Sequence, residues 1–244
     1  MAALKTEAIV LRRRIFSESS LVVALLGRDG GRLDVLAKGC RREKSPLFGH
    51  LDVFQRESVL VLERPQAGLD LLLEAGFVDE YAGLRFLPPA FAAAGLLTNL
   101  AADAALPDDS QAGLFDILAR ALGILSDLGE ASAQARLSPP LPFSPAGKEA
   151  LVGLTLKLAL LDMLDWFGFG IELRRCVGCG LEPESGRDAW LDRRQGGLLC
   201  RKCRSKAGEA RSIGYTALLA LRERGDGSEK REMALPPAER RRWL

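Results

Sequence analysis

Two pairs of cysteines near the C-terminal end place the strongest constraint on how this chain can fold. Each pair has two residues between its cysteines, and twenty residues separate the pairs; the four residues are Cys176, Cys179, Cys200 and Cys203. A C-x2-C…C-x2-C pattern with this separation is typical of four thiolates around one Zn2+ ion. The sequence therefore predicts a module over residues 174–205 that holds one zinc ion per chain.

The expected zinc site is structural, because four protein ligands leave no position on the ion for a substrate or a water molecule. Gly178 and Gly180 relieve the tight backbone around the first pair. A redox role for one pair is the alternative, but neither pair opens a helix after a strand as a thioredoxin-like motif does. Basic side chains flank the pairs, favour thiolates and are candidates for contact with a polyanion: Arg174, Arg175, Arg201 and Lys202.

Composition and charge place the chain among ordinary globular proteins. It has 244 residues, 48% of them hydrophobic and 27% charged. The net charge of +2 hides basic ends around an acidic middle, and a polyanion responds to local charge. The N-terminal segment lacks an apolar signal core, and no stretch reaches about 18 uncharged apolar residues. We therefore expect a cytoplasmic protein without a membrane span, whose cysteines bind metal rather than form disulfides.

The N-terminal part of the chain has the alternating pattern of β-strands. Five such runs follow one another over residues 4–80, with glycine-rich turns such as "GRDGG" between them and no room for crossover helices. This pattern predicts a small five-stranded antiparallel barrel as an N-terminal domain over residues 1–80. The OB-fold has this size and strand count, and SH3-like barrels are similar.

From Pro88 onward the apolar residues recur at helical spacing, so the overall class is a multi-domain α+β protein. We expect an α-helical domain built from residues 81–173 and 206–244, with the zinc module inserted between these two parts. A proline-rich connector is expected over residues 138–145, and Gly129 is expected to end the helix before it.

A basic run lies at the end of the third expected strand. Its cations are Lys38, Arg41, Arg42 and Lys44, and the end of the first expected strand adds Arg13 and Arg14. A basic surface combined with stacking side chains is how proteins hold single-stranded nucleic acid. Phe16, Phe48 and Phe54 are the candidates for stacking, although core packing is the usual role of phenylalanine. The alternative for the cations is a solvated loop.

The sequence lacks the parts of the common catalytic sites. It has no G-x-G-x-x-G after a strand, no phosphate-binding P-loop, no G-x-S-x-G and no H-E-x-x-H. His50 is the single histidine and has no nucleophile or orienting acid marked beside it. We therefore expect a protein without enzymatic activity. Three hypotheses remain open: a DNA-binding protein, a protein-interaction adaptor that uses the zinc module, and a zinc enzyme acting on nucleic acid.

Two segments of the barrel region resemble the RecO family of bacterial recombination mediators and DNA-annealing proteins. They are "EAIVLRRRIFSESSLVV" and "LAKGCRREKSPLFGHLDVFQ", and the resemblance extends over nearly the whole chain. The cysteine set supports it less, since zinc is not universal in that family. The most specific positions are Lys38, Gly39, Arg41, Ser45, Leu47, Leu51 and Phe54.

The resemblance implies an OB-fold in the N-terminal domain and binding of single- and double-stranded DNA, with annealing of complementary strands. It also implies work with the ring-forming partner RecR and help in loading RecA onto DNA covered by single-strand-binding protein. Lys38 and Arg41 fall on positions of the family motif and are the first choices for phosphate contact. Arg42, Lys44, Arg13 and Arg14 are nominated by local charge alone.

Overall fold

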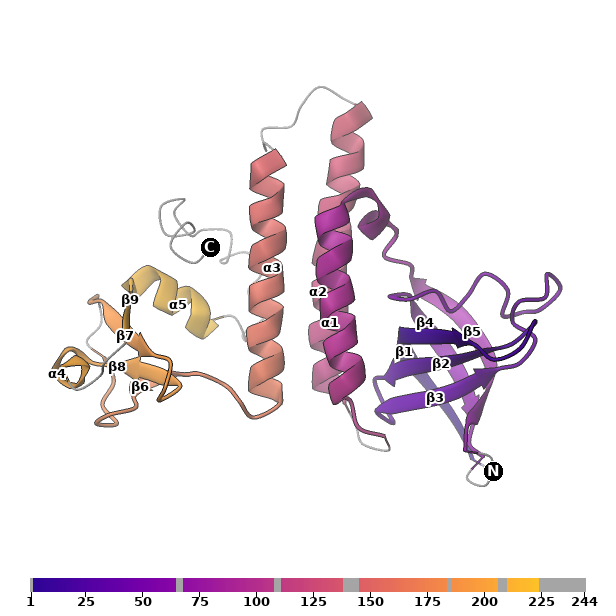
Figure 1. The fold of residues 1–244 in the computed structure, drawn as a ribbon, viewed down its shortest axis with the longest axis horizontal. Helices are drawn as coiled ribbons and strands as arrows, with labels where there is room; N and C mark the ends of the chain where they lie inside the picture. The colour runs from indigo at the N-terminus through magenta and orange to yellow at the C-terminus, as the bar shows by residue number, and fades with distance from the viewer. Residues whose placement is uncertain are drawn as a thin grey trace. The chain divides into compact units, whose positions relative to one another are not determined.

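The computed structural model describes residues 2–64, 68–107, 111–137, 145–183, 186–205 and 210–223. The chain divides into two compact units, Met1–Leu160 and Leu161–Leu244, and Figure 1 labels their elements. The first unit contains a barrel and helices, and the second contains a small sheet with short helices. The expected mixture of an N-terminal five-stranded sheet, helices and a cysteine module is confirmed. None of the helices in these described ranges is long and apolar enough to cross a membrane.

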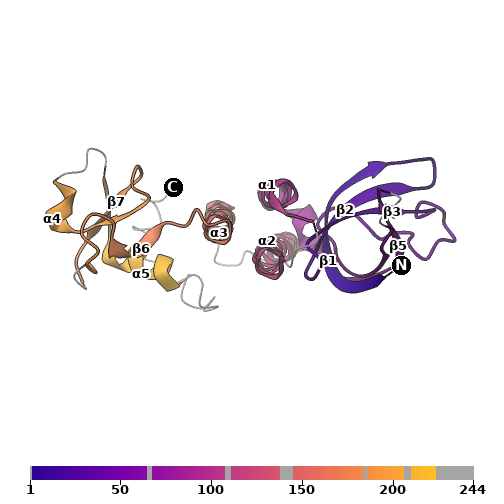
Figure 2. The same ribbon diagram turned by 90° about the horizontal axis from the view of Figure 1, so that it is seen from below.

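Five strands of the first unit close into a barrel in the order β1-β2-β3-β5-β4, and the ring is visible in Figure 2. All neighbouring pairs are antiparallel except β3 and β5, which run parallel. The expected antiparallel pairing is therefore confirmed for four of the five neighbouring pairs and was wrong for β3 and β5. An odd number of strands cannot alternate in direction around a closed ring, so one pair must be parallel. The strands are β1 (Ala3–Ile15), β2 (Leu21–Gly27), β3 (Arg32–Ala37), β4 (Arg56–Leu62) and β5 (Asp70–Asp79).

Alternation of side chains along the strands fills the barrel. In β4, inward positions such as Val59 and Val61 are buried while their neighbours are partly exposed, as period-two alternation requires. The β2–β3 turn forms because Gly30 and Gly31 adopt positive φ angles of 85° and 64°. The long connection over residues 38–55 is not a solvated loop along its whole length. Its apolar residues join the core cluster of the barrel: Cys40, Leu47 and Leu51.

The helices of the first unit follow the barrel. The 3-10 helix η1 (Ala82–Phe86) packs against α2 (Ala112–Leu137), and α1 (Pro88–Ala104) packs against α2 and the barrel. The helix α3 (Pro145–Trp166) begins in the first unit and ends in the second. Most of the expected connector lies outside the described residues. The expectation that Gly129 ends a helix was wrong, because α2 continues past this residue to Leu137.

Gly129 serves close packing instead of chain reversal. A Cβ atom at this position would lie 1.9 Å from the carbonyl oxygen of Gly83, and a Cβ atom at Gly83 would lie 2.0 Å from the carbonyl oxygen of Ser126. The two glycines therefore let the backbones of η1 and α2 touch. Such a contact can be made only without side chains, and this explains a helix-weakening residue in the middle of α2.

Replacement of Gly129 by alanine is expected to destabilise the first unit by about 1–3 kcal/mol or more, because the backbone of η1 must move. Gly95→Ala is the matched control. Its added Cβ meets nothing within 4 Å in α1, so the better helix propensity of alanine should leave stability unchanged or raise it by up to about 1 kcal/mol. Denaturant unfolding of both variants measures the difference. Equal stabilities of the two variants would contradict the close-contact explanation.

The second unit is built around a four-stranded sheet in the order β6-β8-β7-β9. The strands β7 and β8 form an antiparallel hairpin, and Gly196 in its turn has a φ of 66°. A small core that includes Leu198, Ile213 and Leu218 covers the sheet. The elements are β6 (Glu172–Cys176), β7 (Ala189–Asp192), β8 (Gly197–Leu199), α4 (Arg201–Arg204), β9 (Arg211–Ile213) and α5 (Tyr215–Glu223).

Candidate metal centre and nucleic-acid interface

The four paired cysteines come together in the second unit, as their spacing predicts. The sulfur atoms of Cys176, Cys179, Cys200 and Cys203 all lie within 4.8 Å of one another. The Sγ atoms of Cys179 and Cys200 are 3.8 Å apart, whereas a disulfide requires about 2.05 Å. Zn–S bonds of about 2.3 Å in a tetrahedron place neighbouring sulfurs about 3.8 Å apart. The donor set therefore fits a metal ion.

Local backbone geometry assembles these ligands. Cys176 ends β6, and the N–H of Gly180, at a φ of 73°, donates to the carbonyl oxygen of Cys176 over 2.7 Å. A Cβ atom at Gly178 would lie 3.1 Å from the Cβ atom of Cys203. The first pair can therefore approach Cys203 of the second pair closely because residue 178 has no side chain. Gly180 therefore has the backbone role expected from the sequence, and Gly178 makes room for Cys203 instead.

The thiols of the cluster do not share one pKa. Burial raises the pKa of Cys176, but N–H groups, first that of Cys200 and then that of Gly178, outweigh it and lower this pKa to about 6. The Cys200 N–H lies 3.3 Å from the Cys176 sulfur. The neighbouring Cys200 thiol raises the pKa of Cys203 to about 12. Thiolates this close repel one another, so deprotonating all four sulfurs requires a cation among them.

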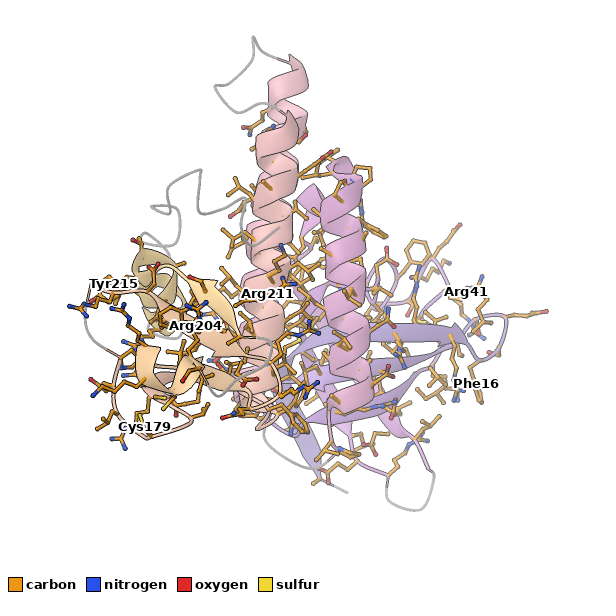
Figure 3. The ribbon with its side chains drawn as sticks, turned by 60° about the vertical axis from the view of Figure 1, so that its left-hand side comes forward. Phe16, Arg41, Cys179, Arg204, Arg211 and Tyr215 are labelled. Carbon is orange, nitrogen blue, oxygen red and sulfur yellow. The ribbon has the colours of Figure 1, made fainter. Side chains whose placement is uncertain are left out.

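The candidate nucleic-acid interface lies at one end of the barrel. Leu21 at the start of β2 pairs with Ile15 and with Ala37, so the β1–β2 loop and the connection after β3 leave the barrel at the same end. Two hydrogen bonds join these segments: Arg41 N–H to the Ser19 carbonyl and Gly39 N–H to Ser20 Oγ, both over 3.1 Å. Figure 3 shows Phe16 and Arg41 at this end of the barrel.

The structure brings most of the predicted cations to the surface there. Five of them are exposed, and no carboxylate of the described residues lies within ion-pair distance of them: Arg14, Lys38, Arg41, Arg42 and Lys44. Arg13 differs, because its guanidinium pairs with Asp52. Arg12 pairs with Asp103 of α1 at 2.7 Å. Unpaired cations keep their charge available to a polyanion, whereas a paired one is partly neutralised.

The three candidate stacking residues differ in solvent exposure. Phe16 and Phe48 are exposed at 61% and 53%, whereas Phe54 is 8% exposed. Phe54 adopts a positive φ of 82° and meets the ring of Phe91 edge-on, with ring centroids 5.2 Å apart. Phe54 is therefore a packing residue, which is the usual role of phenylalanine, and it drops out of the candidates for stacking.

A buried acid anchors the basic connection, and the sequence reasoning missed it. Glu57 is fully buried, and its carboxylate lies 2.9 Å from Nδ1 of His50 and accepts the N–H of Leu51 at 3.5 Å. Burial raises the pKa of Glu57, and the hydrogen bond from His50 opposes this effect. His50 also stacks on Phe77, with ring centroids 4.0 Å apart. Alternation with Val59 and Val61 places Glu57 on the inward face of β4, and this was the available signal.

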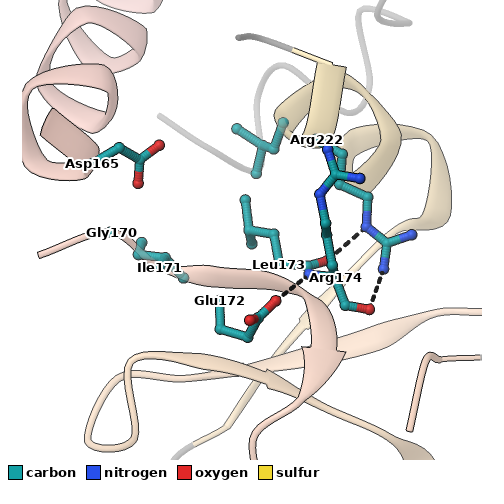
Figure 4. A pocket seen from close by; sticks show the side chains of 8 residues that line it. Asp165, Gly170, Ile171, Glu172, Leu173, Arg174 and Arg222 are labelled. Atoms are coloured by element: carbon teal, nitrogen blue, oxygen red, sulfur yellow. Dashed lines mark hydrogen bonds between the residues drawn. The ribbon is translucent and has the colours of Figure 1, made fainter. Parts of the chain in front are cut away.

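A pocket in the second unit lies next to β6, the strand that ends at Cys176 of the candidate metal centre. It has a volume of about 380 Å³ and lies beside β6 and α5, as Figure 4 shows. Nε of Arg222 donates to the carbonyl of Leu173 over 2.6 Å, and the carboxylate of Glu172 accepts the N–H of Arg174 over 2.6 Å. The N–H groups of Arg175 and Arg174 lower the pKa of Glu172. These polar groups bind the backbone of β6 and so position Cys176.

Comparison with known proteins adds to this geometry. Residues 1–81 match the family description "Recombination protein O N terminal", and residues 153–243 match "Recombination protein O C terminal". The chain is 32% identical to a DNA repair protein RecO of Rhodopirellula baltica, over 95% of this chain and 76% of the relative. It is 32% identical to that of Desulforudis audaxviator, over 86% and 74%.

The similarity to a third relative covers a larger share of both chains than the first two. The DNA repair protein RecO of an Anaeromyxobacter species is 30% identical, over 96% of this chain and 84% of the relative. Both the barrel part and the cysteine part of the chain fall within the matched segments. The chain therefore belongs to the RecO family of DNA repair proteins.

Proposed function

We propose that this protein binds single- and double-stranded DNA and anneals complementary strands in DNA repair. The observation that carries the proposal is the basic end of the barrel, where Lys38, Arg41, Arg42 and Lys44 are exposed and unpaired with carboxylates of the described residues. Phosphate backbones are bound chiefly by such cations, which release counterions from the nucleic acid.

The same proposal takes the barrel to be an OB-fold and residues 1–80 to be the DNA-binding domain. The closed five-stranded order β1-β2-β3-β5-β4 supports it, since an OB-fold is a five-stranded barrel whose β1–β2 loop takes part in binding oligonucleotides. In this protein that loop is hydrogen-bonded to the basic connection through Arg41 and Ser19. The parts expected to hold DNA are therefore contiguous.

Annealing needs no covalent step and so requires no catalytic residues. The protein has to screen the repulsion between two phosphate backbones and leave the base edges free to pair. A basic surface performs the first task, and contacts that avoid the base edges permit the second.

The proposal assigns the remaining parts as follows. The metal is one structural Zn2+ ion per chain in the module of residues 174–205, because four thiolates suit zinc and close its coordination shell. Residues 81–173 and 206–244 are proposed as the helical domain around this module. Membership of the family further supports RecR and single-strand-binding protein as partners, and assistance to RecA loading as the outcome.

Annealing of two complementary oligonucleotides, with and without the full-length protein, tests the proposal. We expect the protein to accelerate annealing and to bind both strand forms, with affinities that fall steeply as salt rises. A protein that captures partner proteins but shows no DNA affinity at moderate salt would contradict the proposal and favour an interaction adaptor.

A further inference from the structure

The basic end of the barrel carries apolar side chains that the fold itself does not use. Ile15, Phe16 and Phe48 are exposed at 70%, 61% and 53%, although Ile15 ends a strand and Phe48 follows the buried Leu47 in a connection whose apolar residues join the barrel core. These side chains come from two segments that are hydrogen-bonded to each other through Arg41 and Ser19, and exposed large apolar side chains at one end of a fold point to a binding surface.

Backbone hydrogen bonds hold these side chains in place. The N–H of Phe16 donates to the carbonyl of Ser20 over 3.0 Å, and the N–H of Phe48 donates to the carbonyl of Ser45 over 3.0 Å. The N–H of Arg41 ties the second segment to the first through Ser19. The rings are therefore presented from short, hydrogen-bonded turns, so little conformational freedom remains to be lost on binding.

The charge around the rings decides what kind of partner fits them. The same two segments also carry exposed cations, so an anion with apolar faces suits this surface: Arg14, Lys38, Arg41, Arg42 and Lys44. Single-stranded nucleic acid combines a phosphate backbone with unpaired bases whose faces are free. In a duplex the same faces are covered by neighbouring base pairs, and only the phosphates remain for the cations.

We propose that Phe16 and Phe48, flanked by Ile15, form a stacking platform for unpaired bases and make this end of the barrel prefer single strands over duplex. The proposal rests on the proposed function, because it assumes that the basic end of the barrel binds DNA. Stacking engages the faces of the bases and leaves their hydrogen-bonding edges open, so a strand held in this way can still pair with its complement. Stacking also tolerates any sequence, since every base has a π-face.

Phe16→Ala and Phe48→Ala are each expected to weaken binding of oligo-dT by about 5- to 150-fold, as loss of one aromatic–base stack does. Binding of a duplex of equal length should change by less than about twofold. The salt slope should stay at the wild-type value, because no phosphate contact is removed. Phe169→Ala is the matched control, since this residue is 75% exposed in the other unit. It should alter neither affinity.

A second variant reports stacking directly. Phe16→Trp in the full chain should show tryptophan fluorescence that oligo-dT quenches beyond the wild-type signal, and a duplex should quench it much less. Equal losses of single-strand and duplex affinity in the alanine variants, or no loss in either, would overturn the platform. If replacing Lys38, Arg41, Arg42 and Lys44 by glutamine also left DNA binding unchanged, both the platform and the proposed function would fail. If that replacement weakened DNA binding, only the platform would fail.

Discussion

Replacement of Cys176 by serine is expected to release the metal and unfold residues around 174–205, while the barrel remains folded. The four sulfurs lie within 4.8 Å of one another, and the module around them has only a small apolar core. A structural zinc ion contributes roughly 10–16 kcal/mol of apparent binding free energy to such a module at neutral pH. No other interaction in the second unit is expected to approach this value.

Elemental analysis of protein purified without chelator measures the first part of the prediction: one zinc ion per chain in the wild type and far less in Cys176→Ser. Limited proteolysis measures the second part, since cleavage should concentrate in the second unit. Cys40→Ser is the matched control, because Cys40 is buried in the barrel core and lies outside the four-cysteine set. This variant should keep its zinc. Wild-type protein without zinc would contradict the assignment of the metal.

Neutralising Lys38, Arg41, Arg42 and Lys44 together to glutamine is expected to produce the largest loss of DNA binding. Each lost phosphate contact lowers the salt slope for single strands by about 0.7, which corresponds to about a fivefold loss of affinity at 0.1 M salt. Loss of all four contacts would therefore weaken binding by up to several hundred-fold. The effect should be large because these cations have no carboxylate partner among the described residues.

A smaller pair of variants separates location from charge. Lys38→Gln removes one unpaired charge at the basic end of the barrel. Lys5→Gln removes one exposed charge that has no ion-pair partner among the described residues, near the opposite end, where β1 begins. The first variant should weaken binding about fivefold at 0.1 M salt and the second far less. Equal losses would show that net charge alone matters.

The parts of the fold that follow local rules could be predicted from the sequence. Cysteine spacing predicted the metal cluster, because each C-x2-C turn points its two thiolates at one ion and two such turns supply the four ligands. Short apolar runs between glycine-rich turns predicted the five strands, and period-two alternation is visible in β3 and β4, whereas β2 is apolar throughout. These patterns depend on neighbours within a few residues of one another.

The parts that depend on distant contacts could not be predicted in this way. The sequence indicated that Gly129 ends a helix. Its close approach to Gly83 shows that the glycine serves packing within a helix that continues to Leu137. The parallel pair of β3 and β5 follows from closing the ring, which no local pattern reports. The segment of residues 38–55 has no period, so its buried residues were not visible in advance, and the alternation of β4 indicated an inward Glu57 without indicating its hydrogen bond to His50. The exposure of Phe16 and the burial of Phe54 likewise depend on tertiary packing.

The claim that the basic end of the barrel holds single-stranded DNA is tested most directly by single-strand binding across a salt series. The wild type is compared with the variant in which Lys38, Arg41, Arg42 and Lys44 are glutamine. Weaker binding, with a salt slope reduced by up to about 2.8, is the predicted result. Unchanged affinity with an unchanged slope would contradict the claim and move the DNA-binding surface elsewhere on the protein.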